Sequence, residues 1–330
     1  MFGKKVNSNL MFIVIALCSL LIGFNFLGPL GGLLVLAALV GWMFYRRRAS
    51  MFYRAARKCF DEGDMEGSKN QLRKSVQAEP QNSVILSSCG FMLLKMGNPI
   101  EAERLLNRAV TTAKTPQEKY SAQSMMSLLL WKKGQLEEAI TLLTSVMENY
   151  KTSATYSTMG FYQIERGNVE QALSFNREAY EYNDKNPVIL DNYGSALLMA
   201  GEHAEALKIY DELIKLNPKF PEAWYNYGRL LEATDQDQEA LRMYQEAGTK
   251  KFWYTSTITR EEVEENLRAL EEKLGITPEF LTENDGDASR QDAAQSVETK
   301  ENDTLLQADP VVETESGMPE DTTNQDGAAD

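Results

Sequence analysis

The residues that most often perform chemistry are few in this chain and form no catalytic pattern. The single histidine, His203, stands between Glu202 and Ala204, where a solvated side chain in a turn is the simplest interpretation. Adjacent carboxylates such as Glu137-Glu138 fit the water-facing side of a helix. The sequence offers no glycine loop that could cradle a phosphate and no nucleophile beside a base. We therefore predict that the protein is not an enzyme and has neither catalytic nor cofactor-binding residues.

The three cysteines, Cys18, Cys59 and Cys89, do not form a reactive or metal-binding set. Cys18 lies in an apolar run, and the spacing of the three matches neither a zinc site nor a disulfide framework. Free cysteine is among the residue types most often buried. The sequence therefore predicts buried thiols and no metal site.

Negative charge is concentrated in the last part of the chain, residues 276–330. This tail holds fifteen acidic residues against Arg290 and Lys300, which leaves the remainder of the chain nearly neutral. A nearly neutral remainder has no basic patch of the kind that nucleic acid requires. We expect neither a nucleic-acid partner nor a small-molecule substrate.

The same tail is rich in Asp, Glu, Thr, Gln and Ala and has few aromatic residues. Such a composition cannot bury enough apolar surface to offset chain entropy, so the sequence predicts a disordered, solvating spacer. An alternative is that a short apolar pair, Leu305-Leu306 or Val311-Val312, recruits a partner or blocks a binding surface.

An uncharged stretch covers residues 10–45. One straight helix of this length would span about 54 Å, well beyond the roughly 30 Å hydrocarbon core of a bilayer. Gly28-Pro29 marks a break, because proline removes a backbone donor. The sequence therefore predicts two transmembrane helices, 10–27 and 30–45, that form a hairpin in the lipid bilayer.

Basic residues flank this stretch on both sides, with Lys4 and Lys5 before it and Arg46, Arg47 and Arg48 after it. Positive flanks stay cytoplasmic, which places residues 1–9 and everything after the hairpin in the cytoplasm. The compact two-helix anchor favours a bacterial cell membrane. Two alternatives stay open: a cleaved signal peptide, and a single tilted crossing that would put the rest of the chain on the other side.

Self-similarity is the most informative property of the sequence. One unit reads Trp224-Tyr225-Asn226-Tyr227-Gly228, followed by Leu231, Ala240, Tyr244 and Ala247. This pattern resembles the tetratricopeptide repeat, a helix-turn-helix of 34 residues. The register predicts six units within residues 49–251, starting near Ala49, Ser83, Tyr120, Ser153, Pro187 and Pro221.

Two positions recur in nearly every unit. A turn glycine ends the first helix at Gly63, Gly97, Gly134, Gly167 and Gly201, with Asp235 in the sixth unit. A small residue sits where the two helices cross, at Ser68, Ala102, Ala139, Ala172, Ala206 and Ala240. The resemblance implies an all-α fold in which the units stack as a right-handed solenoid. A capping helix over 252–275 follows, with Thr259 and Glu262 as a capping box.

The resemblance also implies a function, because such arrays bind segments of partner proteins in a concave groove lined by the first helix of each unit. Carried over by position, the expected groove residues are Phe91, Leu94, Leu128, Trp131, Phe161, Ile164, Asn192, Tyr225, Asn226 and Arg229, with Lys95 and Lys132 beside them. Asn192 and Asn226 occupy equivalent positions and could bond a peptide backbone. Asp191 stands where the carboxylate-binding version of the repeat needs a lysine, so recognition of a C-terminal carboxylate is not expected.

The apolar and aromatic centre of this groove suits a peptide or amphipathic helix with hydrophobic anchors. The alternative is that these large side chains only pack between neighbouring first helices. We predict a membrane-anchored scaffold or adaptor that holds a partner protein at the cytoplasmic face. An accessory or regulatory subunit of a membrane-associated enzyme complex, in cell-envelope assembly or proteolysis, is the alternative function.

Overall fold

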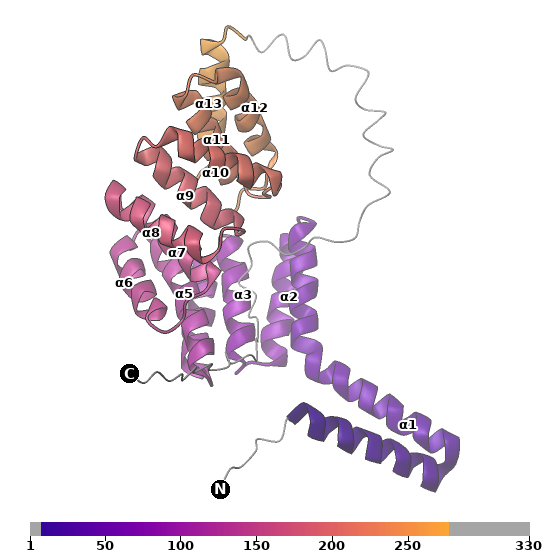
Figure 1. Ribbon diagram of the computed structural model, residues 1–330. Coiled ribbons are helices and arrows are strands. Elements are labelled where there is room, and N and C mark those ends of the chain that lie inside the picture. The colour runs from indigo at the N-terminus through magenta and orange to yellow at the C-terminus, as the bar shows by residue number, and fades with distance from the viewer. Residues whose placement is uncertain (1–7, 277–330) are drawn as a thin grey trace, which may run out of the picture. The chain divides into compact units, whose positions relative to one another are not determined.

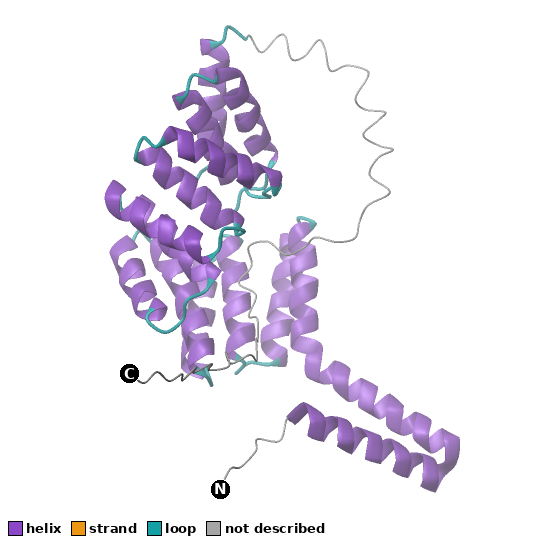
Figure 2. Ribbon diagram, viewed as in Figure 1, coloured by secondary structure: helices purple, strands orange, loops and turns teal. Residues whose placement is uncertain are grey.

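The computed structural model describes residues 8–276, and within that range every regular element is an α-helix (Figure 1, Figure 2). The predicted acidic tail falls almost entirely outside this range, as do residues 1–7. The helices are α1 (Ser8–Asp61), α2 (Met65–Ala78), α3 (Ser83–Lys95), α4 (Pro99–Thr112), α5 (Pro116–Lys132), α6 (Leu136–Met147), α7 (Ser153–Glu165), α8 (Val169–Tyr182), α9 (Pro187–Met199), α10 (His203–Lys215), α11 (Pro221–Ala233), α12 (Asp237–Thr249) and α13 (Arg260–Lys273).

α1 consists of two helical segments that meet at a sharp kink. Gly28 has φ 67° and ψ −162°, which lies outside the helical region, and Pro29 follows it. A Cβ at Gly32 would lie 2.5 Å from Cδ2 of Phe24, so the absence of a side chain at Gly32 lets the two segments approach. In Figure 1 the chain turns back beside itself at this point.

The second segment of α1 does not stop at the predicted end of the apolar stretch. The sequence predicts a helix that ends at residue 45 and a repeat unit that starts separately at Ala49, whereas one helix runs from Gly28 to Asp61. The residues between them, Arg46-Arg47-Arg48, are good helix formers and contain no breaker. The first repeat is therefore a direct continuation of the apolar helix.

Twelve helical segments, from the end of α1 to α12, form six consecutive pairs, and the two helices of each pair pack against each other. α5 begins at Pro116, four residues before the predicted start at Tyr120. The Thr115 side chain accepts a hydrogen bond from the Glu118 backbone and proline occupies the first turn, two signals that begin a helix at this point.

The turn between the two helices of a pair uses a left-handed residue each time. Gly63, Gly97, Gly134, Gly167 and Gly201 have φ between 73° and 85°, and Asp235 takes the same conformation at φ 59°. The predicted role of these residues is confirmed.

The predicted crossing residues are buried. Ser68 and the five equivalent alanines have no exposed surface. Close approach also depends on glycines in the first helices: a Cβ at Gly194 would lie 2.5 Å from the Tyr210 ring, and one at Gly228 would lie 2.6 Å from the Tyr244 ring. The tyrosines fill the space that the glycines leave.

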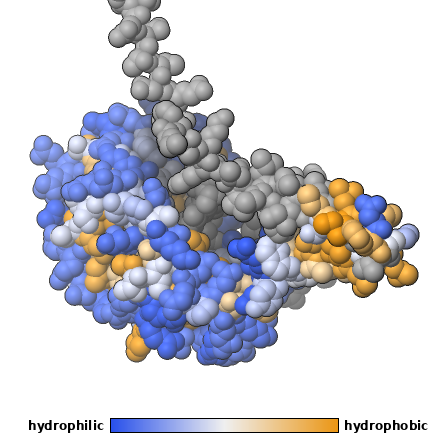
Figure 3. Space-filling view, turned by 90° about the horizontal axis from the view of Figure 1, so that it is seen from below, coloured by the Kyte–Doolittle hydropathy of each residue, from blue (hydrophilic) through white to orange (hydrophobic). Residues whose placement is uncertain are grey.

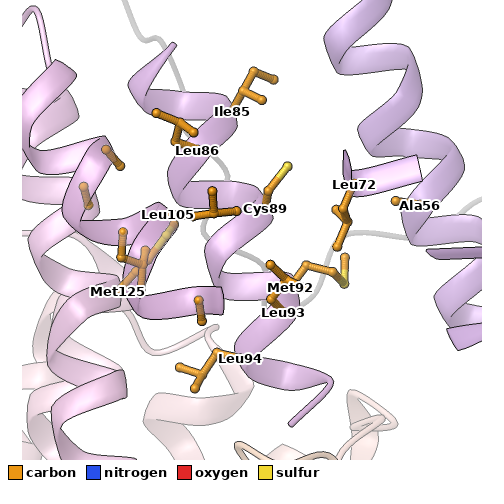
Figure 4. Packing of buried hydrophobic residues seen from close by; sticks show 14 of the residues in the cluster. Ala56, Leu72, Ile85, Leu86, Cys89, Met92, Leu93, Leu94, Leu105 and Met125 are labelled. Atoms are coloured by element: carbon orange, nitrogen blue, oxygen red, sulfur yellow. The ribbon is translucent and has the colours of Figure 1, made fainter. Parts of the chain in front are cut away.

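The chain divides into two compact units. Unit 1 comprises residues 1–150 together with 253–256, and unit 2 comprises residues 151–252 and 257–330. The core of unit 1 is mainly aliphatic, with the buried ring of Phe60 among its members. Figure 4 shows side chains from α2, α3 and α4 within it, with Met92 of α3 turned toward Leu72 of α2. The core of unit 2 contains the buried rings of Tyr193 and Tyr210.

The predicted capping helix over 252–275 is shorter than expected. α13 begins at Arg260, with Thr259 and Glu262 forming the predicted capping box. Residues 251–259 form a turn-containing loop instead. Thr259 explains the later start, because an N-cap residue has extended backbone and ends any helix that precedes it.

Candidate protein-binding site

The first helices of the pairs lie side by side within each unit, and we call the surface they share the first-helix face. In unit 1, α1 contacts α3 and α3 contacts α5; in unit 2, α7 contacts α9 and α9 contacts α11. All ten residues predicted to line the groove belong to these helices.

The four groove residues predicted in unit 1 differ in exposure. Leu94 is fully buried in the core and unavailable to a ligand. Phe91, Leu128 and Trp131 are partly buried, and the first two pack against the core cluster. Phe91 and Trp131 also meet the side chains of Lys95 and Lys132, whose ammonium groups lie 5.8 Å and 4.1 Å from the respective ring centres.

A short segment of the same chain, Trp253–Ser256, lies on the first-helix face of unit 1. The Trp253 ring stacks on Phe60 of α1 with ring centres 4.2 Å apart. The Tyr254 backbone N–H donates to the carbonyl oxygen of Lys95 at 3.2 Å. The Lys132 ammonium group donates to the carbonyl oxygen of Ser256 at 2.9 Å. We call this segment the aromatic turn.

The aromatic turn is closed by its own hydrogen bonds. The Ser256 N–H donates to the Trp253 carbonyl oxygen at 3.0 Å, and the Ser256 hydroxyl oxygen accepts from the Trp253 N–H at 3.1 Å. The two rings therefore extend from a compact loop whose backbone is already partly paired.

Two lysines stand over the aromatic rings. The Lys95 ammonium group lies 5.7 Å from the Trp253 ring centre, and that of Lys132 lies 5.4 Å from the Tyr254 ring centre. A cation over a ring face contributes about 0.5–1 kcal/mol at exposed sites. These contacts join side chains predicted to bind a partner to a segment of the chain itself.

In unit 2, the predicted asparagines are used inside the array. The Asn192 amide is 6% exposed and donates to the Ser157 carbonyl oxygen of α7 at 2.7 Å. The Asn226 amide donates to Oδ1 of Asp191 at 3.1 Å. Both bonds join neighbouring first helices, which favours packing over ligand binding for these donors.

Asp191 is a buried carboxyl group between three helices. Its Oδ1 also accepts from the Tyr210 hydroxyl of α10 at 3.2 Å. Burial raises the pKa of Asp191 to about 7, the nearby Glu222 carboxylate raises it further, and the hydrogen bonds from Asn226 and Tyr210 oppose the rise. Asp191 therefore puts a carboxyl group at the position where a carboxylate-binding repeat would have a lysine, and this group carries no positive charge at any pH.

The other predicted residues of unit 2 remain accessible to different degrees. Phe161 and Ile164 are partly buried on α7, and Arg229 is exposed on α11. Tyr225 and Arg229 line a shallow pocket of about 490 Å³ that also includes Asn266 of α13. The Tyr225 hydroxyl accepts a hydrogen bond from the Asn266 amide at 2.6 Å. This pocket offers a guanidinium group and rings to a polar ligand.

The chemistry-bearing residues that the sequence singled out do not converge. Among the described residues, no group of three His, Cys, Asp or Glu side chains is placed to hold a metal ion. Burial raises the pKa of the Cys89 thiol to about 12, which disfavours the reactive thiolate. By contrast with the prediction of buried thiols, Cys18 is exposed on α1 and Cys59 is only partly buried.

The aromatic turn is the feature that the sequence interpretation missed. The predicted capping segment, 252–275, includes Phe252-Trp253-Tyr254 ahead of the capping box at Thr259, and the sequence analysis gives these three aromatic residues no role. An aromatic run between two amphipathic helices was the available signal.

The N-terminal segment presents apolar side chains to its surroundings. Phe26, Leu30, Leu33 and Leu34 are all more than 60% exposed. Figure 3 shows hydrophobic side chains covering the projecting hairpin, whereas the repeats are mostly hydrophilic on this face. Among the described residues one helix, Gly28–Asp61, is long and apolar enough to cross a membrane.

Comparison with known proteins agrees with the fold. The family described as tetratricopeptide repeat matches residues 187–230. Residues 187–230 therefore match the tetratricopeptide repeat, and the all-helical fold agrees with that family. Among curated proteins, no match to the sequence was found.

Solved structures with this fold align with more than half of this chain. The APC/C hetero-tetramer Cut9-Hcn1 aligns with a TM-score of 0.52 at 17% identity, over 62% of this chain and 39% of that one. The human IFIT1 dimer with PPP-AAAA aligns with a TM-score of 0.51 at 19% identity, over 63% and 49%. Pseudomonas aeruginosa pilF aligns with a TM-score of 0.48 at 15% identity, over 61% and 91%. The expectation that this chain binds no nucleic acid stays a prediction.

Proposed function

We propose that the protein is a membrane-anchored, non-enzymatic scaffold that binds another protein through the first-helix face of its repeats. The observation that carries this proposal is that the face in unit 1 already binds a polypeptide turn. Lys95 and Lys132 contact backbone atoms of that turn and the first helices supply its aromatic partners. A surface that pairs backbone hydrogen-bonding groups and packs against aromatic rings can bind a segment of another protein in the same way.

Membrane anchoring is supported by the continuity of α1. Residues 28–45 would span about 27 Å as a helix, close to the hydrocarbon thickness of a bilayer. Further along the same helix, Ala49, Ala56 and Phe60 are buried in the first repeat. No flexible linker separates the two parts, so a membrane-inserted α1 would hold the repeats at the bilayer surface.

The flanks of this helix support a cytoplasmic location for the repeats. Arg46 and Arg47 are exposed directly after Tyr45, and Arg46 lies 5.1 Å from the Trp42 ring centre. Aromatic residues followed by arginines are typical of the cytoplasmic interface. The predicted bacterial cell membrane and the two-helix topology remain part of this proposal.

Crosslinking in native membranes tests the scaffold. A photoreactive amino acid at Phe161, on the first helix of its pair, is expected to capture a defined partner. The matched control is the same amino acid at Ser174, an exposed position on the second helix. Capture from Ser174 with none from Phe161 would contradict binding at the first-helix face.

Alkaline extraction tests the anchor. Leu34→Lys combined with Leu36→Lys adds two charges to the exposed apolar surface of α1, and each costs about 2.5–3.5 kcal/mol on insertion. The variant is expected to leave the membrane fraction. Ile100→Lys, at an even more exposed apolar position in the repeats, is the control and is expected to stay membrane-bound. Retention of the first variant would contradict the anchor.

A further inference from the structure

The aromatic turn belongs to the first-helix face of unit 1 although its chain neighbours do not. Residues 253–256 are part of unit 1, whereas Phe252 and Thr257 belong to unit 2. Phe252 packs with the core of unit 2, and the Thr257 N–H donates to Oε1 of Glu222 at 2.8 Å. Four residues therefore bind the face as a short, separately anchored peptide would.

The face recognises this segment by three kinds of contact. Phe60 supplies a stacking surface for the first ring, and Trp253 lies partly buried against the core cluster. The Lys95 carbonyl oxygen and the Lys132 ammonium group bind one backbone donor and one backbone acceptor. The Tyr254 ring lies against the turn at Gly97, since a Cβ there would meet its Cδ2 at 3.7 Å, an ordinary van der Waals distance.

None of these contacts requires that the bound segment belong to the same chain. The backbone groups are common to every polypeptide, and the rings select for two successive aromatic residues. The hydrogen bond from the Trp253 N–H to the Ser256 hydroxyl oxygen selects for a serine or threonine three positions after the first ring, where its hydroxyl closes the turn.

We propose that the aromatic turn is an internal ligand, and that a partner protein binds unit 1 by presenting a turn of the same chemistry in its place. The partner's turn would carry two successive aromatic residues followed by a hydroxyl side chain at the fourth position. This inference rests on the proposed function and names the ligand class that the face takes.

A free peptide must compete with the attached aromatic turn for the face, and this competition determines how much its affinity is reduced. A segment held close to its site acts at an effective concentration in the millimolar range. A free peptide whose intrinsic Kd is about 0.1 mM then binds the intact chain roughly tenfold more weakly than it binds a chain with an empty face. Replacing the rings of Trp253 and Tyr254 should empty the face and make the free peptide bind about tenfold more tightly.

The probe is an acetylated and amidated peptide with the sequence of residues 252–257, labelled with a fluorophore. Binding is measured by fluorescence anisotropy with the full chain in detergent micelles. The double variant Trp253→Ala and Tyr254→Ala is expected to bind the probe about tenfold more tightly than the unmodified chain. Adding Lys132→Ala to that variant is expected to weaken binding again.

Lys133→Ala is the matched control, because Lys133 is the next residue but pairs with Glu103 instead of the aromatic turn. It is expected to leave probe binding unchanged in the double variant. Equal affinity of the probe for the unmodified chain and the double variant would overturn the proposal, and so would equal effects of the two lysine changes.

If circular dichroism shows that the double variant has lost its helices, the single variant Trp253→Phe replaces it, because phenylalanine keeps a ring stacked on Phe60. This variant is expected to bind the probe more tightly than the unmodified chain, and equal affinity overturns the proposal. Crosslinking from Phe161 distinguishes the proposed scaffold function from the proposed internal ligand. If a partner is captured at Phe161 but the probe binds no variant, the scaffold function stands and the internal-ligand proposal is wrong.

Discussion

Replacing Asp191 by asparagine is expected to stabilise the protein above neutral pH and to leave its stability nearly unchanged in acid. The carboxyl group is 5% exposed, and its pKa is raised from 3.8 to about 7. Below the unfolded pKa the group is protonated in both states. As the pH rises to 7, the unfolded chain ionises while the folded chain stays neutral, so stability falls with pH.

The magnitude follows from the shift. A raised pKa of about three units corresponds to about 4 kcal/mol of stability lost between pH 4 and pH 7. Asparagine keeps an Oδ1 acceptor for Asn226 and for the Tyr210 hydroxyl but cannot ionise. We expect a gain of about 3 kcal/mol at pH 8, on the order of 10 °C in Tm for a cooperative unit of roughly 100 residues.

Thermal unfolding followed by circular dichroism, with the full chain in detergent at pH 4 and pH 8, measures the effect. Asp184→Asn changes an exposed carboxylate in the same unit and serves as the control. A difference between Asp191→Asn and the unmodified protein that is equal at both pH values would refute the reasoning. Lower stability of Asp191→Asn at pH 8 would refute it as well.

Three further expectations follow from the repeats. Gly228→Ala would place a Cβ 2.6 Å from the Tyr244 ring and is expected to cost about 1–3 kcal/mol in thermal unfolding, whereas Gly248→Ala meets nothing within 4 Å and is expected to be neutral or stabilising; equal costs would contradict this. Asp235→Gly relieves a left-handed non-glycine residue at φ 59° and should raise stability by about 0.5–1 kcal/mol, and a loss would show that the side chain is needed. Cys89 should resist a thiol reagent at pH 8 until the protein unfolds, because its pKa is about 12; rapid labelling in the native protein, located by peptide mass, would disprove its burial.

The repeat fold is readable from the sequence because each unit repeats the same local constraints. Gly97 and Gly201 take the left-handed turn that their positions predict, and Ala102 and Ala206 are buried at the crossings. These features depend on neighbours within about 34 residues, so periodicity alone reveals them.

The binding site is less predictable because it depends on contacts between distant residues. Lys132 and Ser256 are 124 positions apart, and no local pattern relates them. The asparagine positions illustrate the same limit: Asn192 has the residue type of a ligand-binding position, yet its amide bonds the neighbouring helix. Two helices, α5 and α13, begin at other residues than predicted, and here the cause is local. Thr115 is the N-cap residue of α5 and Thr259 is that of α13.

Hydrogen exchange on the full chain in membranes, with and without a crosslink-identified partner, tests most directly whether the first-helix face binds another protein. Slower exchange is expected in the first helices, such as α3 and α5 or α7 and α9, with little change in α4 and α8. Slower exchange confined to the second helices, or to the residues after Gly275, would contradict the account.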